Sequence, residues 1–526
     1  MIATVQTPHF DWEALSPLVA LGGGMVVALI LGLLPGRSGR FLAIVSGAIA
    51  TILAIVFAAL LWDEPVQREA IASSLVIDRA SLVALVISSA SALAGLLFAA
   101  RAHGTEDAGD GETAALILAS TLGMGILAAS NDLVTIFLGL ELLSVPLYVL
   151  CASHVDRTAS LESGLKYLIL GSVGSATALM GLALIYGATG TMSIPDIGAS
   201  AGDSDLQGLV YPGIALLIAG FGFKLSLAPL HQWTPDVYDG APTAVTAFMS
   251  VATKTAALVV TARLLLEGFG APETFQYWQP ILLTLAATSI VVGNVGALGQ
   301  PGMKRLMGYS SIAQAGYLVA ALAVGAIGAL LAYLAAYAVA TLTVFAVIAA
   351  RETERPDLGD DISALDGLAK ERPLLAWLGT LGLFGLAGLP LTAGFFGKIA
   401  VAGALINADK AWLAVLMLVG SIISLAYYAP PVIRMWRTVG GEAPAAPAAS
   451  AATGFATAVS AGTPGFSAAG SPADAGFSTP VVPTGLRWEV AVIGIVAGLL
   501  VLAGGLYPDP IFNLATEASS ALLGGQ

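Results

Sequence analysis

Residues 220–254 read GFGFKLSLAPLHQWTPDVYDGAPTAVTAFMSVATK, and this stretch decides how the rest of the chain is interpreted. It places Lys224, His231 and Lys254 in an otherwise apolar background, together with three prolines. A lysine near the centre of a bilayer costs roughly 2.5–3.5 kcal/mol on insertion scales, so such lysines usually serve a function. We therefore expect this stretch to hold part of the machinery of the protein.

The break expected in this stretch is as informative as its charges. Pro229 follows Lys224 in a segment apolar enough to span, and a proline inside a helix leaves a carbonyl without its partner. In lipid, such a break survives only where protein or water satisfies the freed groups. Lys224, Pro229 and His231 therefore predict a discontinuous helix that lines a hydrated cavity. The alternative is an ordinary proline kink whose lysine extends to the membrane interface.

Composition excludes a soluble globular protein. The chain has 526 residues, of which 57% are hydrophobic and only 10% charged, which is typical of a polytopic membrane protein. The net charge of −13 arises from acids that fall mostly in predicted loops, and we interpret them as solvated loop faces.

No cofactor or metal is expected in this chain. A single cysteine, Cys151, excludes an internal disulfide and cannot hold an iron–sulfur cluster. The four histidines are too scattered to indicate haem pairs or a metal cage, and no Walker-type loop or GxGxxG motif is present. If electrons or nucleotides are involved, another subunit must handle them.

The fold class expected is an all-α integral membrane protein of about fourteen transmembrane helices, two of them discontinuous, with two inverted five-helix repeats. The N-terminus is acidic and its apolar run is long, which indicates a first span and not a cleaved signal. The predicted spans lie near residues 15–35, 41–62, 80–100, 113–130, 131–152, 162–188, 208–230, 241–266, 277–299, 303–323, 326–350, 373–404, 411–436 and 487–507.

The predicted organisation has five parts. They are a three-helix segment (1–112), a first repeat (113–266), a second, inverted repeat (277–436), a flexible Ala/Pro/Gly/Ser-rich loop (437–486), and a last helix with its tail (487–526). This loop consists largely of Ala, Pro, Gly and Ser with almost no charge, so we expect it to bury no core and to be flexible.

The distribution of cations predicts that both termini lie on the outer side of the membrane. Thirteen cations then fall on the inner side and four on the outer, while Lys166, Lys224, Lys254 and Lys398 fall within spans. The inner ones are Arg37, Arg40, Arg101, Arg157, Lys304, Arg305, Arg351, Arg355, Lys370, Arg372, Arg434, Arg437 and Arg487, and the outer ones are Arg68, Arg79, Arg263 and Lys410.

Glu141 is a carboxylate in the middle of a predicted span. It must either bind a proton or find a cation, and Lys224 or Lys166 would serve. Separating such a pair would release both groups toward neutrality, which makes a proton switch; the alternative is a static ion pair that only holds helices together. Lysine suits the task because burial can lower its pKa by several units, whereas arginine stays charged. We expect all the buried cations to be lysines.

Lys398 follows a second predicted break, in TLGLFGLAGLPLTAGFFGKIA, where Pro390 lies between glycine-containing segments. Two interrupted helices, each with a lysine, are typical of transporters built from inverted repeats. The match is loose, because the lysine precedes the proline in one unit and follows it in the other, and Glu141 has no acidic counterpart near residues 310–314.

Taken together, these segments resemble the antiporter-like proton-pumping subunits of respiratory complex I, a family shared with multisubunit cation/proton antiporters. The resemblance covers most of residues 113–404. It rests on six segments, which are LELLSVPLYVL around Glu141, SGLKYLILGSVGSA around Lys166, FKLSLAPLHQWTPDVYDGAPT around Lys224 and His231, SVATK at Lys254, MKRLMGYSSIAQAGY from Met303, and GLPLTAGFFGK ending at Lys398. Within the family, a lysine on the second broken helix favours the N branch.

The resemblance implies the role of each site residue. Glu141 and Lys224 would form a pair, Lys254 and His231 would relay protons along the membrane midplane, and Lys398 would lie nearest the outer exit. Lys166 would modulate or extend the pair. The long loop at 437–486 departs from the family pattern.

The function predicted on this basis is proton translocation within NADH:quinone oxidoreductase, driven by quinone reduction in other subunits. NADH, FMN, iron–sulfur clusters and quinone would belong to those subunits. Its partners would be other membrane subunits on both sides, including a second antiporter-like subunit, in a bacterial inner membrane. Two alternatives stay open: a subunit of a cation/proton antiporter, and a structural spacer in the membrane.

Overall fold

The computed structural model describes residues 10–35, 37–63, 67–100, 110–201, 207–438 and 488–522. Nearly all of the predicted flexible loop at 437–486 lies outside these residues, as do Arg101 and Arg487 of the charge count.

Within the described residues, eleven helices are long and apolar enough to cross a membrane, by length and composition. This confirms the prediction of a helical membrane protein. The eleven are α2 (Arg37–Leu60), α3 (Arg79–Ala99), α4 (Asp110–Ala129), α5 (Leu133–Cys151), α6 (Thr158–Thr189), α10 (Thr243–Arg263), α11 (Pro272–Ala297), α12 (Met303–Ala323), α13 (Ile327–Glu354), α17 (Ala411–Trp436) and α18 (Trp488–Leu506).

Shorter elements complete the described fold. Four are apolar helices, namely α1 (Ser16–Gly32), α8 (Gln207–Lys224), α15 (Pro373–Ala387) and α16 (Ala393–Asn407). The others are η1 (Leu61–Asp63), α7 (Ile194–Ser200), α9 (Trp233–Gly240), η2 (Leu264–Gly268), η3 (Ile362–Leu365), α14 (Leu368–Glu371), α19 (Asp509–Leu522) and the strands β1 (Gln67–Ile71) and β2 (Leu75–Asp78).

The described fold departs from helices at one place, where β1 and β2 pair as a short antiparallel hairpin. The hairpin leads directly into α3, whose first turn is capped by Asp78: its carboxylate accepts the backbone N–H of Ser81. Such a cap satisfies a donor that the first turn of a helix leaves free. The hairpin therefore places Asp78 at the start of a buried helix.

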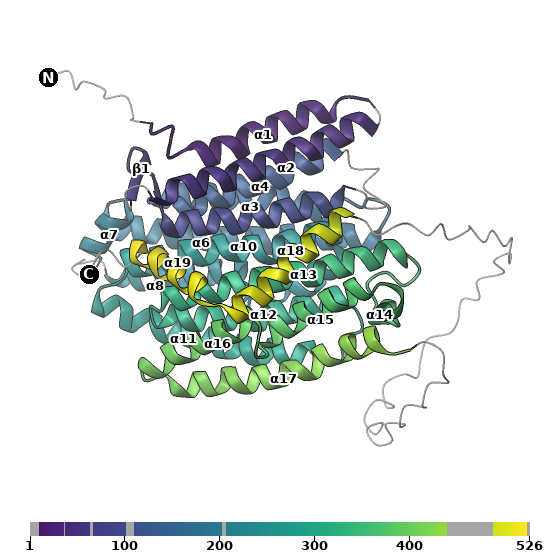
Figure 1. Cartoon of the computed structure of the whole chain (residues 1–526). Helices are drawn as coiled ribbons and strands as arrows, with labels where there is room; N and C mark the ends of the chain where they lie inside the picture. The colour runs from purple at the N-terminus through teal and green to yellow at the C-terminus, as the bar shows by residue number, and fades with distance from the viewer. Residues whose placement is uncertain are drawn as a thin grey trace, which may run out of the picture.

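The core of the molecule follows three helices. Every residue of α10 is buried, and α12 and α13 are buried over most of their length. Figure 1 shows α10 in the middle of the bundle, with α1 and α2 at one edge and α17 at the opposite edge. A helix that is apolar on all sides except for a few polar groups belongs in such an interior position.

The two ends of the bundle differ in charge. One end, here called the basic end, holds Arg157, Lys304, Arg305, Arg355 and Arg434, which lie at or near helix ends. A bridge between Gly302 and Asp361 ties two connections together there. The other end, the hairpin end, holds β1 and β2. The first and last described segments both lie there, because Phe10 bridges to Ile71 and the Trp62 indole donates to Glu517.

Both predicted helix breaks are present. Helix α8 ends at Lys224 and the chain resumes as α9 at Trp233, while α15 ends at Ala387 and α16 begins at Ala393. Each break holds one residue other than glycine with a left-handed backbone, Ser226 with φ of 62° and Leu391 with φ of 73°. Such backbone is uncommon outside glycine and often marks a functional segment.

Candidate functional site

The first break is held open by specific contacts. The Ala228 N–H donates to Ser289 Oγ at 2.8 Å, and Thr288 Oγ1 donates to the Ala228 carbonyl at 3.0 Å, both from α11. At the end of α8, the Phe223 carbonyl accepts the indole N–H of Trp233 at 3.0 Å. Because the freed backbone groups have partners, the helix can stay broken inside the membrane.

Lys224 ends α8 in an aromatic pocket. Its side chain is buried, and Nζ donates to the Tyr167 hydroxyl at 3.3 Å. The same Nζ lies 5.1 Å from the ring centre of Tyr167 and 5.8 Å from that of Tyr148. Aromatic rings attract a cation through their faces, so the pocket tolerates an ammonium group without a direct carboxylate partner.

Glu141 lies beside this pocket but does not bind the lysine directly. Its carboxylate interacts electrostatically with both Lys224 and Tyr148. Its Oε1 is buried and has no hydrogen-bond partner among the residues that the structure describes. The structure thus brings Glu141 and Lys224 into one region and leaves the carboxylate able to accept a further hydrogen bond.

Lys254 comes from α10 and reaches the same break. Its Nζ donates to the Leu225 carbonyl at 3.1 Å and to Ser226 Oγ at 3.0 Å. The last carbonyls of a helix lack intrahelical partners and carry partial negative charge. The Lys254 ammonium therefore caps the end of α8, one residue beyond Lys224.

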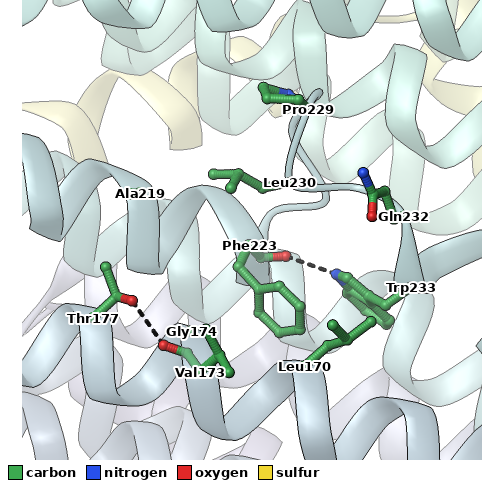
Figure 2. Close-up of a pocket in the computed structure, with 10 residues that line it drawn as sticks. All are labelled: Leu170, Val173, Gly174, Thr177, Ala219, Phe223, Pro229, Leu230, Gln232 and Trp233. Atoms are coloured by element: carbon green, nitrogen blue, oxygen red, sulfur yellow. Dashed lines mark hydrogen bonds between the residues drawn. The ribbon is translucent and has the colours of Figure 1, made fainter.

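His231 lies within the break and is half-buried, with a buried Nδ1 that has no partner in the described part of the chain. Beside it, a cleft of about 240 Å³ separates α6 from the broken segment. Figure 2 shows Pro229, Leu230 and Gln232 along one side of this cleft and Leu170, Val173 and Thr177 of α6 along the other. The polar side of the break is therefore not fully covered by the described helices.

The second break has the same chemistry at its centre. Lys398 of α16 donates through Nζ to the carbonyls of Leu386 and Ala387, both at 2.9 Å, where α15 ends. The Tyr317 ring centre lies 5.1 Å from the same nitrogen. A second lysine ammonium therefore caps a second half-helix.

Gln314 of α12 completes this second site. Its amide donates to the Leu386 carbonyl at 3.1 Å, the same oxygen that Lys398 binds, and its amide oxygen accepts the Tyr333 hydroxyl. Gln314 thus occupies the region in which the sequence offered no acidic counterpart to Glu141. The site around Lys398 has a neutral amide where the first site has a carboxylate.

Lys166 does not share this buried environment. Its side chain is 40% exposed, and Nζ pairs with Glu162 at 2.6 Å and Asp236 at 2.9 Å near the basic end. The alternative partner proposed for Glu141 is therefore engaged elsewhere, since two other carboxylates hold it. Asp236 also accepts Arg305 at 2.8 Å, so Lys166 belongs to a half-exposed ion-pair cluster.

The expectation that all buried cations are lysines is wrong. Arg263 is 1% exposed and Arg351 is 2% exposed, so at least two of the buried cations are arginines. Arg263 is predicted at the outer side of the membrane, but it lies buried at the end of α10, where it pairs with the buried Asp78. The site also uses Tyr167, Ser226 and Gln314, which were not predicted as site residues although all three lie in stretches that carry the family resemblance.

One prediction concerns the backbone at Gly388. This residue has φ of 77°, and a Cβ built on it would lie 2.7 Å from Lys398 Cδ and 3.3 Å from Nζ. We expect Gly388→Ala to displace the lysine from the end of α15 and to lower transport activity several-fold, because both backbone and space oppose the methyl group. The measurement is the transport activity divided by the amount of this chain in the membrane.

Gly403→Ala is the matched control, since nothing lies within 4 Å of a Cβ built at that position of α16. Equal activity of Gly388→Ala and Gly403→Ala would show that the position of Lys398 is unimportant.

Comparison with known proteins gives a consistent family. Residues 130–424, more than half of the chain, match the family described as NADH:quinone oxidoreductase/Mrp antiporter, TM. NADH-quinone oxidoreductase subunit N of Maricaulis maris is 37% identical over 429 residues, which cover 81% of this chain and 88% of that protein.

Solved structures agree. A chain of respiratory complex I from Thermus thermophilus with bound aureothin is 32% identical, with a TM-score of 0.74 and coverage of 94% of this chain and 98% of that one. A chain of the Mrp complex from Dietzia sp. has a TM-score of 0.78 at 22% identity, covers 98% of this chain and 97% of that one, and shows a shared fold alone. The chain therefore belongs to the NADH:quinone oxidoreductase/Mrp antiporter family of membrane proteins, and the curated relative that it resembles is a subunit N.

Proposed function

We propose that this chain is a proton-translocating membrane subunit of an NADH:quinone oxidoreductase, and so part of a translocating enzyme without a redox centre of its own. The proton is carried by Glu141, Lys224, His231, Lys254 and Lys398. Lys166, which lies in the ion-pair cluster with Asp236, modulates the pair of Glu141 and Lys224. Moving one charge against 100 mV requires about 2.3 kcal/mol, so translocation needs an energy source. We assign this source to quinone reduction in other subunits.

One observation carries the proposal: two lysine ammonium groups bind the carbonyl ends of the two broken helices. The end of a helix carries about half a negative charge, which favours a protonated amine over a neutral one. When the proton leaves, most of this attraction is lost and the end of the half-helix is freed. Proton release at Lys254 or Lys398 is thus linked to the conformation of the break.

Glu141 controls how readily Lys224 holds its proton. A carboxylate stabilises the ammonium form of Lys224 when it approaches and weakens that form when it moves away. Its unpartnered Oε1 is compatible with a group that changes partners during turnover. Lys224 is the last residue of α8 and Lys254 binds the carbonyl of the next residue, Leu225, so a movement of α8 at Lys224 changes the contact of Lys254.

The shorter apolar helices bring the proposed number of crossings to fourteen. Helix α1 crosses alone, α8 with α9 makes one crossing, and α15 with α16 makes another. The helices α4 to α10 and α11 to α17 then form two units of five crossings, each with its broken helix fourth, and an odd number inverts the second unit. The cations of the basic end favour an inner position for it, with both termini outside, in a bacterial inner membrane.

The cleft in Figure 2 supports a partner on that face. Gln232 is exposed and His231 is half-exposed at a helix break in the membrane, and polar groups of this kind are costly against lipid. Other membrane subunits of the complex, including another antiporter-like one, would cover them. NADH, FMN, iron–sulfur clusters and quinone are assigned to other subunits of the complex.

Glu141→Gln tests the proposal with little structural change, because the Oε1 that it alters has no described hydrogen bond. We expect NADH-driven proton translocation in inside-out membrane vesicles to fall at least roughly tenfold, because a positioned proton-transfer group typically contributes on the order of 100-fold or more. The amount of assembled complex should stay unchanged on a native gel.

The competing functions give different results. A structural spacer predicts normal translocation in Glu141→Gln. A cation/proton antiporter predicts that vesicles holding the chain without a redox partner exchange sodium for protons. Either result would overturn the assignment.

A further inference from the structure

A second polar site lies at the basic end, outside the machinery described above. A partly open cavity of about 400 Å³ is lined there by the ends of α3, α4, α10 and α13 and by the connection between α5 and α6. Its polar lining includes His154, Arg157, Thr243 and Glu352. A cavity of this size has room for on the order of ten water molecules.

His154 is the unusual residue of this cavity. Its side chain is 9% exposed, and neither Nδ1 nor Nε2 has a hydrogen-bond partner among the described residues. Burial, with help from the nearby cations Arg157 and Lys304, lowers the pKa of His154 to about 4. A buried neutral imidazole still offers one donor and one acceptor, and buried polar groups normally have partners.

The charged groups around the cavity are balanced. Lys304 of α12 lies 3.6 Å from Glu352 of α13 and also donates to the Ala241 carbonyl. Thr243 donates its hydroxyl to Glu352, so the carboxylate is held by two partners. Arg157 is the exposed cation of the same loop as His154. The lining therefore does not form a net positive site for an anion.

A polar stripe on α10 leads inward from the cavity. Thr243, Thr246, Ser250 and Lys254 follow one another at intervals of three, four and four residues, which places them on one face of the helix. Three hydroxyls flank this face: Tyr238 contacts Ser311 at 3.4 Å, Ser311 contacts Tyr337 at 3.2 Å, and Tyr337 donates to the Ser250 carbonyl at 3.0 Å.

We propose that this cavity is where the chain takes up protons, and that His154 is the residue that receives them. Protons then pass along the stripe on α10 to Lys254. A hydronium ion in the cavity gives its proton to one ring nitrogen while the other ring nitrogen releases its own, so the imidazole ends neutral and no other reactant is consumed. This inference rests on the proposed function and adds to it the loading residue.

A pair of variants of equal size tests it in the assembled complex. We expect His154→Gln to slow proton translocation in inside-out vesicles roughly tenfold, since an amide does not exchange protons in this way. His154→Glu has the same shape as the glutamine variant but can bind and release a proton, and we expect it to recover most of the rate. Equal and slow rates for both, or a normal rate for His154→Gln, would overturn the inference.

Accessibility gives an independent measurement. Ala244 lines the cavity, whereas Ala257 is buried farther along the same helix. We expect a charged thiol reagent added to inside-out vesicles to modify Ala244→Cys and to spare Ala257→Cys, as judged by mass spectrometry of this chain. The parent chain controls for Cys151, which is buried. An unreactive Ala244→Cys would contradict a water-filled cavity.

The two proposals can fail separately. If Glu141→Gln blocks translocation and His154→Gln does not, the uptake site is wrong and the proposed function stands. If Glu141→Gln translocates protons normally in the same membranes, the proposed function itself is wrong.

Discussion

Lys224→Arg is expected to abolish most proton translocation although it keeps the positive charge. The lysine lies in an aromatic pocket with the Tyr167 hydroxyl as its only described hydrogen-bond partner, so its role in the proposed cycle is to hold a proton and then to lose it. Arginine does not release its proton in proteins. A side chain that stays charged cannot complete the cycle, so we expect translocation to fall at least roughly tenfold.

The measurement is the rate of NADH-driven proton uptake into inside-out vesicles, divided by the amount of assembled complex. Lys370→Arg is the control, because Lys370 is an exposed cation on α14 at the basic end and has no role in the proposed cycle. A wild-type number of protons per NADH in Lys224→Arg would show that Lys224 supplies charge alone.

The sequence was informative where a local rule decides the structure. Proline and glycine interrupt the apolar runs near Pro229 and Pro390, and the structure places breaks at 225–232 and 388–392. The buried positions of Lys224, Lys254 and Lys398 follow from the length of the apolar segments around them. These features depend only on neighbours in the chain.

Partners could not be predicted in the same way. Lys254 binds the Leu225 carbonyl and the Ser226 hydroxyl, 29 and 28 positions earlier in the chain, and nothing in the sequence around Lys254 specifies these partners. Lys166 falls within a predicted span by hydropathy, yet the first turns of α6 bring it to the half-exposed carboxylate of Asp236. Only the packing of α6 against α9 decides between Glu141 and Asp236 as its partner.

The burial of Arg263 could not be predicted from the sequence either, and the reason is physical. Arg263 ends a run that reads as the outer edge of a span, where a cation normally reaches water. The hairpin brings Asp78 to the same point, and the two side chains meet at 2.5 Å with 1% and 0% of their surface exposed. A contact between residues 185 positions apart is invisible to hydropathy.

This buried pair gives the largest expected effect on stability. Arg263→Met leaves the Asp78 carboxylate buried without its cation, and breaking such a pair from one side costs about 3–5 kcal/mol. Asp78 also caps α3 through Ser81, so the damage reaches the start of that helix. We expect a marked loss of assembled chain and a lower Tm of the purified complex.

The double variant Arg263→Met with Asp78→Asn tests the cause of this loss. The asparagine keeps an oxygen for the Ser81 N–H and removes the fully buried charge, whereas Glu267, the second acid paired with Arg263, is 19% exposed. Replacing both members of a buried pair is often close to neutral. We therefore expect it to recover most of the Tm. Arg355→Met is the matched exposed control, since its pair with Glu371 is 42% and 44% exposed and pairs of that kind contribute about 0–1 kcal/mol. If the double variant is as unstable as Arg263→Met, the loss comes from packing of the arginine stem and not from an unpaired carboxylate.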